Sequence, residues 1–288
     1  IAHEIGHNMD KLGKAEITNN IYSILVQTWD GNAATFPSRL EKSNKYRGIF
    51  TKVAQGYPGA SNDVFVQLGL YWQLHLAYDD ADPLAFYNSF FKAWKAGTYT
   101  AGAAGYDDRL ALTAAGVTGK DLTEFFTRWG MDLSQPTRDK LAQYEDESRA
   151  IWYLNDQSRR DRLAGVSAAA GSLTAEARKA GDREITITLD ASGITGNIQG
   201  FEIRRNGKSI AFVTEETYTD IIGSANHRTY HYEVVAYDSL GNLIAAADAG
   251  EVRVAYDKTV DPSEYDITRS ADGAVVITMK EETTISGL

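Results

Sequence analysis

The chain has 288 residues, 43% of them hydrophobic, so it is long enough for more than one domain with its own core. Its formal net charge of -10 and the absence of long basic runs argue against nucleic acid as a partner. No cysteine is present, which excludes disulfides and thiolate metal sites, and no apolar stretch reaches the roughly 18 residues of a membrane span. An acidic chain without cysteine is consistent with a secreted or cell-surface bacterial protein.

The chain opens with His3-Glu4-Ile5-Gly6-His7, which fits the pattern H-E-x-x-H. Residues four apart lie on one face of a helix, so the two histidines can bind one zinc ion. Glu4 lies about 100° further round such a helix, where it can act as general base toward a water whose pKa the metal lowers. The same pattern also occurs by chance, as two surface histidines beside a solvated glutamate.

A zinc site needs a third protein ligand beside these two histidines. Gly13 is expected to end the first helix and let the chain reverse, which places Glu16 in the first turn of the next helix. A carboxylate there completes a His₂Glu set of His3, His7 and Glu16 and leaves a fourth position for water. Asn20 follows one turn later, where it can hydrogen-bond Glu16 or a histidine ligand.

The rest of residues 1–163 shows helical patterns. "DVFVQLGLYWQLHLAY" is apolar on nearly all sides and predicts a buried helix. "KDLTEFFTRWG" predicts a helix that stops at Gly130, and "PTRDKLAQYEDESRAIWYL" predicts a last amphipathic helix. This part of the chain is therefore expected to be a mainly helical unit.

A polar stripe runs along the predicted buried helix, formed by Gln67, Tyr71, His75 and Tyr78. If it faced a cleft, His75 or Tyr78 could stabilise the oxyanion of a tetrahedral intermediate. A core histidine or tyrosine that hydrogen-bonds a neighbour is the commoner arrangement, and we favour that interpretation.

After residue 163 the pattern changes to short alternating stretches. "REITITLDA" and "TYHYEVVAYDSLGN" alternate, and Asn206-Gly207 joins two strand-like runs, which is typical of a hairpin. Residues 164–258 are predicted to form an immunoglobulin- or fibronectin type III-like β-sandwich. Residues 259–288 are predicted to begin a further β-module that is truncated. The expected fold class is therefore multidomain α + β, a helical zincin subdomain followed by an all-β sandwich.

Three stretches, "HEIGHNMDKLGKAEITNNIYS", "VQLGLYWQLHLAY" and "FFTRWGMDLS", resemble the enhancin-like, mucin-targeting gluzincins of the M60 peptidase family. The resemblance covers about residues 1–150. Its family pattern places a glutamate ligand a short distance after H-E-x-x-H, and here eight residues intervene. The resemblance implies zinc as cofactor, with His3, His7 and Glu16 as ligands and Glu4 as general base.

The resemblance further implies a secreted or surface-bound zinc endopeptidase that acts on mucin-type O-glycosylated proteins, with glycan contacts through the β-modules. In that family a β-rich half precedes the active-site helix. Because this chain begins at Ile1, residues 1–163 are expected to be the helical half of a catalytic domain, in a fragment that can be inactive alone. Two alternatives stay open. One is a general or enhancin-type protease without a glycan requirement, and the other is a glycan-binding or adhesion module with a vestigial metal site.

Overall fold

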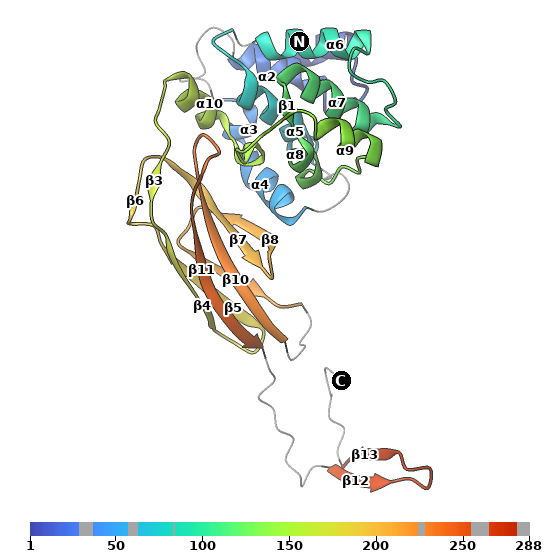
Figure 1. The fold of residues 1–288 in the computed structure, drawn as a ribbon, viewed down its shortest axis with the longest axis vertical. Helices are drawn as coiled ribbons and strands as arrows, with labels where there is room; N and C mark the ends of the chain where they lie inside the picture. Colours follow the sequence, from blue (N-terminus) through green and yellow to red (C-terminus); the bar gives the residue numbers. More distant parts are fainter. Residues whose placement is uncertain (29–36, 57–62, 83, 224–227, 255–264, 281–288) are drawn as a thin grey trace.

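The computed structural model describes residues 1–28, 37–56, 63–82, 84–223, 228–254 and 265–280 (Figure 1). Helices come first along the chain and strands follow. The helices are α1 (Ala2–Met9), α2 (Asn20–Thr28), α3 (Arg39–Lys42), α4 (Lys45–Gln55), α5 (Val64–Tyr78), α6 (Ala85–Ala96), α7 (Tyr106–Thr118), α8 (Thr123–Arg128), α9 (Gln135–Leu141) and α10 (Asp156–Leu163). The short paired strands β1 (Lys120–Asp121) and β2 (Glu145–Asp146) and the 3₁₀ helix η2 (Ile151–Tyr153) complete this unit.

Helix α5 lies at the centre of the helical unit. Asp63 caps it, since Oδ1 accepts hydrogen bonds from the backbone N–H groups of Phe65 and Val66 at 2.9 and 3.4 Å. Helices α2, α3, α4, α6 and α10 pack around α5, and its residues from Leu68 to Ala77 are all buried. The prediction of a buried helix here is confirmed. Within the described part of the chain, no helix has the length and hydrophobicity that crossing a bilayer requires.

The first two helices are shorter than the sequence suggested. Helix α1 ends at Met9, so Gly13 does not terminate it. Gly13 lies instead in the following turn, with a φ of +77°. Helix α2 begins only at Asn20, so Glu16 precedes it rather than standing in its first turn. The connection between the two helices is therefore longer than expected, and α1 packs directly on its last residue, Asn19.

The last predicted helix of this unit is also divided. The stretch "PTRDKLAQYEDESRAIWYL" forms α9, the short strand β2 and η2, not a single helix. Its middle, "AQYEDES", is polar and offers no continuous apolar face that a helix could bury. The end of this segment is buried where the helical unit meets the strands, at Ile151, Trp152 and Tyr153.

Seven strands form two antiparallel sheets that share one apolar core and together make a β-sandwich. One sheet has the order β4-β5-β9 and the other β11-β10-β7-β8. Their bounds are β4 (Thr174–Lys179), β5 (Glu184–Asp190), β7 (Ile198–Arg205), β8 (Lys208–Val213), β9 (Thr217–Ile221), β10 (Arg228–Asp238) and β11 (Leu243–Val254). The short strands β3 (Ala170–Gly171) and β6 (Ile194–Thr195) pair separately.

The turn between β7 and β8 is the predicted hairpin. Asn206 and Gly207 have φ angles of +51° and +74°, as a type I′ turn requires, so the hairpin prediction is confirmed. Strands β12 (Tyr265–Arg269) and β13 (Val275–Met279) form a second hairpin that lies apart from the sandwich (Figure 1). Residues 259–264 and 281–288 of the predicted third module lie outside the described residues.

An aromatic cluster and a buried carboxylate join the helical unit to the sandwich. The ring of Tyr153 stacks on that of Phe212 with centroids 3.9 Å apart, and Phe50 meets the same ring edge-on at 5.2 Å. The Glu202 side chain on β7 is fully buried. It accepts hydrogen bonds from Tyr153 Oη at 2.6 Å and from Arg128 Nη1 at 3.0 Å. The carboxylate therefore ties η2 and α8 to the sandwich.

Replacing Glu202 by glutamine is expected to lower the free energy of unfolding by about 3 kcal/mol, because the buried partner of Arg128 loses its charge. Urea denaturation followed by circular dichroism measures the change. Glu176→Gln is the matched control, since Glu176 pairs with Arg178 on the exposed face of β4. We expect this control to keep the original midpoint. Equal stability of both variants would contradict the role assigned to Glu202.

Candidate metal centre

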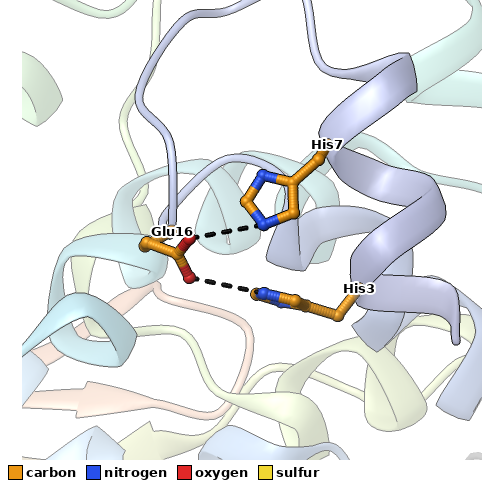
Figure 2. Close-up of side chains that lie close together, drawn as sticks. All are labelled: His3, His7 and Glu16. Atoms are coloured by element: carbon orange, nitrogen blue, oxygen red, sulfur yellow. Dashed lines mark ion pairs between the residues drawn. The ribbon is translucent and has the colours of Figure 1, made fainter.

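His3, His7 and Glu16 converge at the surface of the helical unit (Figure 2). His3 Nε2 lies 3.3 Å from Glu16 Oε2, and His7 Nε2 lies 3.3 Å from Glu16 Oε1. Both rings project from one face of α1, with centroids 4.8 Å apart and planes at 85°. Across the described ranges, this is the one group of three or more such side chains whose ligand atoms lie close enough to share a metal ion.

The separations suit zinc. Tetrahedral bonds of about 2.0–2.1 Å place ligand atoms about 3.3–3.5 Å from one another, which agrees with both nitrogen–oxygen distances. The side chains of His3, His7 and Glu16 are 29%, 36% and 60% exposed, so solvent reaches the cluster from one side. Two imidazoles and a carboxylate with an open side are the donor set of a catalytic zinc site. The residues present therefore fit this metal.

A tight connection between α1 and α2 presents Glu16. The Asp10 carboxylate holds it together, since Oδ1 accepts from Leu12 N at 2.9 Å and Oδ2 accepts from Thr18 Oγ1 at 2.6 Å. Trp94 anchors the same connection, because its indole N–H donates to the Lys11 carbonyl at 2.9 Å. Glu16 itself has a φ of +64°, a left-handed conformation that is costly for residues other than glycine. The surrounding contacts hold the carboxylate in this strained turn.

Gly6 sets the separation between α1 and the residues before α2. A Cβ atom at this position would lie 2.4 Å from the backbone oxygen of Asn19. Real Cβ atoms do not approach backbone oxygen so closely, so only glycine lets α1 rest on Asn19. This contact brings both histidine rings within reach of Glu16.

Gly6→Ala is therefore expected to push α1 away and to weaken zinc binding by about tenfold or more, with a loss of about 1–3 kcal/mol in stability. Isothermal titration calorimetry with zinc measures the first effect and thermal unfolding the second. Gly223→Ala provides the control, because no atom of the described residues lies within 4 Å of a Cβ built there. Zinc affinity in Gly6→Ala equal to that of the control would show that the spacing of α1 does not matter.

Asn20 contacts two members of the cluster. Its Oδ1 lies 3.0 Å from His3 Nδ1, and its Nδ2 donates to the Glu16 backbone oxygen at 2.7 Å. Because Asn20 Oδ1 can only accept, a proton on His3 Nδ1 completes this contact, and Nε2 is the ring nitrogen that faces Glu16. The spacing of Asn20 predicted a hydrogen bond with Glu16 or with a histidine ligand, and the contact with His3 is the second of these.

Two buried neighbours of the cluster were not predicted from the sequence. Thr18 and Asn19 are both 0% exposed, and Asn20 beside them is 2% exposed. Three consecutive buried polar residues next to an otherwise apolar helix are unusual. The run "TNN" could therefore have indicated a buried polar contact at this place. Its function depends on α1 packing above it, which local pattern does not show.

Glu4 stands in the first turn of α1 and is exposed. In the part of the chain that the structure describes, its carboxylate has no hydrogen bond or ion pair. It also lies directly beside His3 in the chain. The side chain therefore lies in solvent, one residue along α1 from the first of the three cluster residues.

His75 lies in the core of the helical unit. It is 1% exposed, and its ring stacks on Trp72 and Tyr87 with centroid distances of 4.3 and 5.7 Å. Burial, reinforced by the positive charges of Arg159 and Arg162, holds the pKa of His75 well below its usual value. The imidazole is therefore neutral and packed between aromatic rings.

Tyr78 is engaged elsewhere as well, since its hydroxyl donates to Glu147 Oε2 at 2.6 Å. Among the described residues, neither His75 nor Tyr78 has a hydrogen bond or an ion pair to the metal-ligand cluster. His75 is buried within α5, as the favoured interpretation expects, and the partly buried Tyr78 is engaged with Glu147. The oxyanion role considered for either residue stays a prediction.

A cavity of about 270 Å³ borders the turn that carries Glu16. Lys14 and Ile17 of that turn form one wall, and Tyr71, Tyr106 and Trp129 contribute aromatic surface. The hydroxyls of Tyr71 and Tyr106 lie 2.8 Å apart. A cavity of about 550 Å³ between the helical unit and the sandwich includes none of the cluster residues. Neither cavity is lined by His3, His7 or Glu16, and the smaller one borders the turn of Glu16 only through Lys14 and Ile17.

Comparison with known proteins gives a family for this region. Residues 1–130 match the family model described as peptidase M60, enhancin and enhancin-like. A comparison with curated proteins found no match.

Solved structures of similar fold come from Clostridium perfringens. The M60 catalytic domain of ZmpC, in complex with the sialyl T antigen, has a TM-score of 0.62 and 24% identity over 88% of this chain and 49% of its own. The catalytic module of the metalloprotease ZmpA has a TM-score of 0.59 and 26% identity over 85% of this chain and 47% of its own. The ZmpB metallopeptidase has a TM-score of 0.60 and 23% identity over 88% of this chain and 49% of its own.

Residues 1–130 are thus similar to the M60 peptidase model, and most of the chain shares the fold of M60 catalytic domains. The chain spans about half the length of each of these solved chains. The likeness to ZmpC and ZmpB, below 25% identity, shows the fold alone. It extends over most of the chain and so includes both the helical unit and much of the sandwich.

Proposed function

We propose that this chain carries the metal centre of a secreted bacterial zinc endopeptidase that acts on mucin-type O-glycosylated proteins. The observation that carries the proposal is the convergence of His3, His7 and Glu16 with two nitrogen–oxygen separations of 3.3 Å. The match of residues 1–130 to the M60 peptidase model supports the same class of enzyme.

In this mechanism His3, His7 and Glu16 hold the metal. Zinc, when bound, polarises the peptide carbonyl and lowers the pKa of water. Glu4 accepts a proton from the attacking water and returns it to the departing amine, so one exposed carboxylate serves as base and then as acid. Asn20 keeps the His3 ring in one tautomer and one orientation throughout.

Two observations support a glycoprotein substrate. The structurally similar ZmpC domain was solved with the sialyl T antigen, a glycan. In this chain, the cavity that borders the turn of Glu16 is lined by the aromatic residues Tyr106 and Trp129 and by Lys14, whose ammonium group lies over the Tyr106 ring. Aromatic faces with polar groups at the edge suit a sugar or a bulky substrate side chain.

We further propose the fibronectin type III-like assignment for residues 164–258, with 1–163 as the helical half of the catalytic unit and 259–288 as part of another β-module. The division of seven main strands into sheets of three and four, both antiparallel around one core, supports it. The contacts of Phe212 and Glu202 with the helical unit indicate that this sandwich also stabilises the catalytic part.

Cleavage assays with a mucin-type glycopeptide and its deglycosylated form test the substrate class. The proposal expects cleavage of the glycopeptide and at least about a tenfold lower kcat/KM for the bare peptide. Equal cleavage of both would favour a general or enhancin-type protease. Sugar binding that persists in Glu4→Gln, with no cleavage of either peptide by the unchanged protein, would favour an adhesion module.

A further inference from the structure

Asn19 contacts both histidine rings of the cluster from the protein interior. Its Nδ2 lies 3.3 Å from His3 Nε2 and 3.1 Å from His7 Nε2. The same atom is 3.4 Å from Nδ1 of each ring. Because it is nearly equidistant from the two nitrogens of each imidazole, the amide lies against the ring faces and leaves both Nε2 lone pairs directed elsewhere.

The position of this amide is fixed on two sides. The Asn19 backbone oxygen abuts Gly6 so closely that a Cβ there would lie at 2.4 Å, so α1 rests directly on this residue. Asn20 Nδ2 donates to Asn19 Oδ1 at 3.5 Å, which turns the Nδ2 group toward the histidines. The side chain is 0% exposed, so no water layer separates it from the rings.

Each imidazole can rotate about two side-chain bonds, and Asn20 restrains only that of His3. His7 has no comparable contact from Asn20, and the ring planes meet at 85°. One buried NH₂ group that touches both faces restrains both rings together. It thereby keeps the two Nε2 atoms on the side of Glu16, where each lies 3.3 Å from a carboxylate oxygen.

We propose that Asn19 is a positioning residue that preorganises His3 and His7 for one divalent metal ion. This inference rests on the proposed metal centre. It assigns Asn19 no contact with metal or substrate. Removing the amide is expected to lower metal affinity by about tenfold, the lower end of the effect of outer-shell partners of metal-binding histidines.

Cobalt(II) titration of the full chain tests this inference, because bound Co²⁺ reports affinity and ligand geometry through its visible absorption. We expect Asn19→Leu, which keeps the size of the side chain and removes both N–H donors, to bind Co²⁺ about tenfold more weakly with altered bands at saturation. Asn8→Leu is the matched control, since Asn8 is exposed on α1 beside His7. Asn19→Ser, which is smaller and still polar, provides a second variant if the leucine is not tolerated.

A measurement without metal separates positioning from folding. In ¹³C-histidine-labelled protein, the His3 and His7 ring signals of the unchanged chain should report single ordered rings. In either Asn19 variant they should show averaging, while the His75 signal and the thermal midpoint stay as they were. Unchanged Co²⁺ affinity, bands and ring signals in a folded Asn19 variant would overturn the inference. Failure of the unchanged chain to bind Co²⁺ would instead refute the metal centre itself.

Discussion

Glu4→Gln is expected to lower kcat/KM for peptide cleavage by about a hundredfold to ten-thousandfold while zinc remains bound. Glutamine keeps the size of the side chain but cannot accept a proton from water at neutral pH. The metal ligands should be unaffected, because Glu4 is exposed and makes no contact with them in the described part of the chain. Thermal unfolding should also be unchanged, since an exposed carboxylate on α1 supports no packing.

This prediction is checked by steady-state cleavage of a glycopeptide together with metal analysis of the same sample. Glu251→Gln is the control, because Glu251 is an exposed glutamate on β11 of the sandwich. We expect the control to cleave at the original rate. Full activity in zinc-loaded Glu4→Gln would show that another group moves the proton.

His7→Ala is expected to have the largest effect on metal binding. It removes one of two nitrogen donors and leaves His3 and Glu16, whose Nε2 and Oε2 lie 3.3 Å apart. Two ligands hold zinc far more weakly than three, so affinity should fall by more than the roughly hundredfold that outer-shell changes produce. Zinc content after dialysis, measured by atomic emission, should drop from about one per chain to near zero.

His231→Ala is the matched control for that experiment. His231 lies on β10 with its side chain 44% exposed, and its Nε2 lies 2.9 Å from Asp248 Oδ1, so it is another solvent-accessible histidine with a carboxylate partner. It should retain zinc like the unchanged chain. Equal zinc content in both variants would mean that any bound zinc lies outside the proposed site.

The sequence predicted that His3, His7 and Glu16 would lie close together, because the three residues are near one another along the chain. His3 and His7 are four residues apart, so any helix places both rings on one face, and Glu16 follows within one chain reversal. The buried helix α5 could also be predicted, because a stretch that is apolar on all sides of a helix is stable only when it is buried. The change from helix to strands after residue 163 also followed directly from hydrophobic periodicity.

The details of the site depended on distant parts of the chain. Glu16 lies in a left-handed turn instead of a helix because Asp10, Thr18 and Trp94 hold the connection in that shape. The residue types in this turn do not predict a left-handed conformation at Glu16. The contact of Asn19 with the rings likewise requires α1 to rest on it at Gly6.

Long-range packing also decided the roles of the remaining polar residues. His75 and Tyr78 lie on a polar stripe whose pattern alone fits a cleft or a core, and only the aromatic partners and Glu147 distinguish the two. Similarly, α9 ends at Leu141, and Tyr153 further along the chain stacks on Phe212 of β8, a contact that the local pattern does not show. Periodicity within a segment cannot show which distant surface will cover it.

Anomalous diffraction at the zinc absorption edge, from crystals of the chain grown with zinc, would locate a metal ion bound by His3, His7 and Glu16. We expect one strong peak that lies about 2.0–2.2 Å from His3 Nε2, His7 Nε2 and a Glu16 carboxylate oxygen. A zinc-containing crystal with no peak there, or with these three side chains pointing apart, would contradict this expectation.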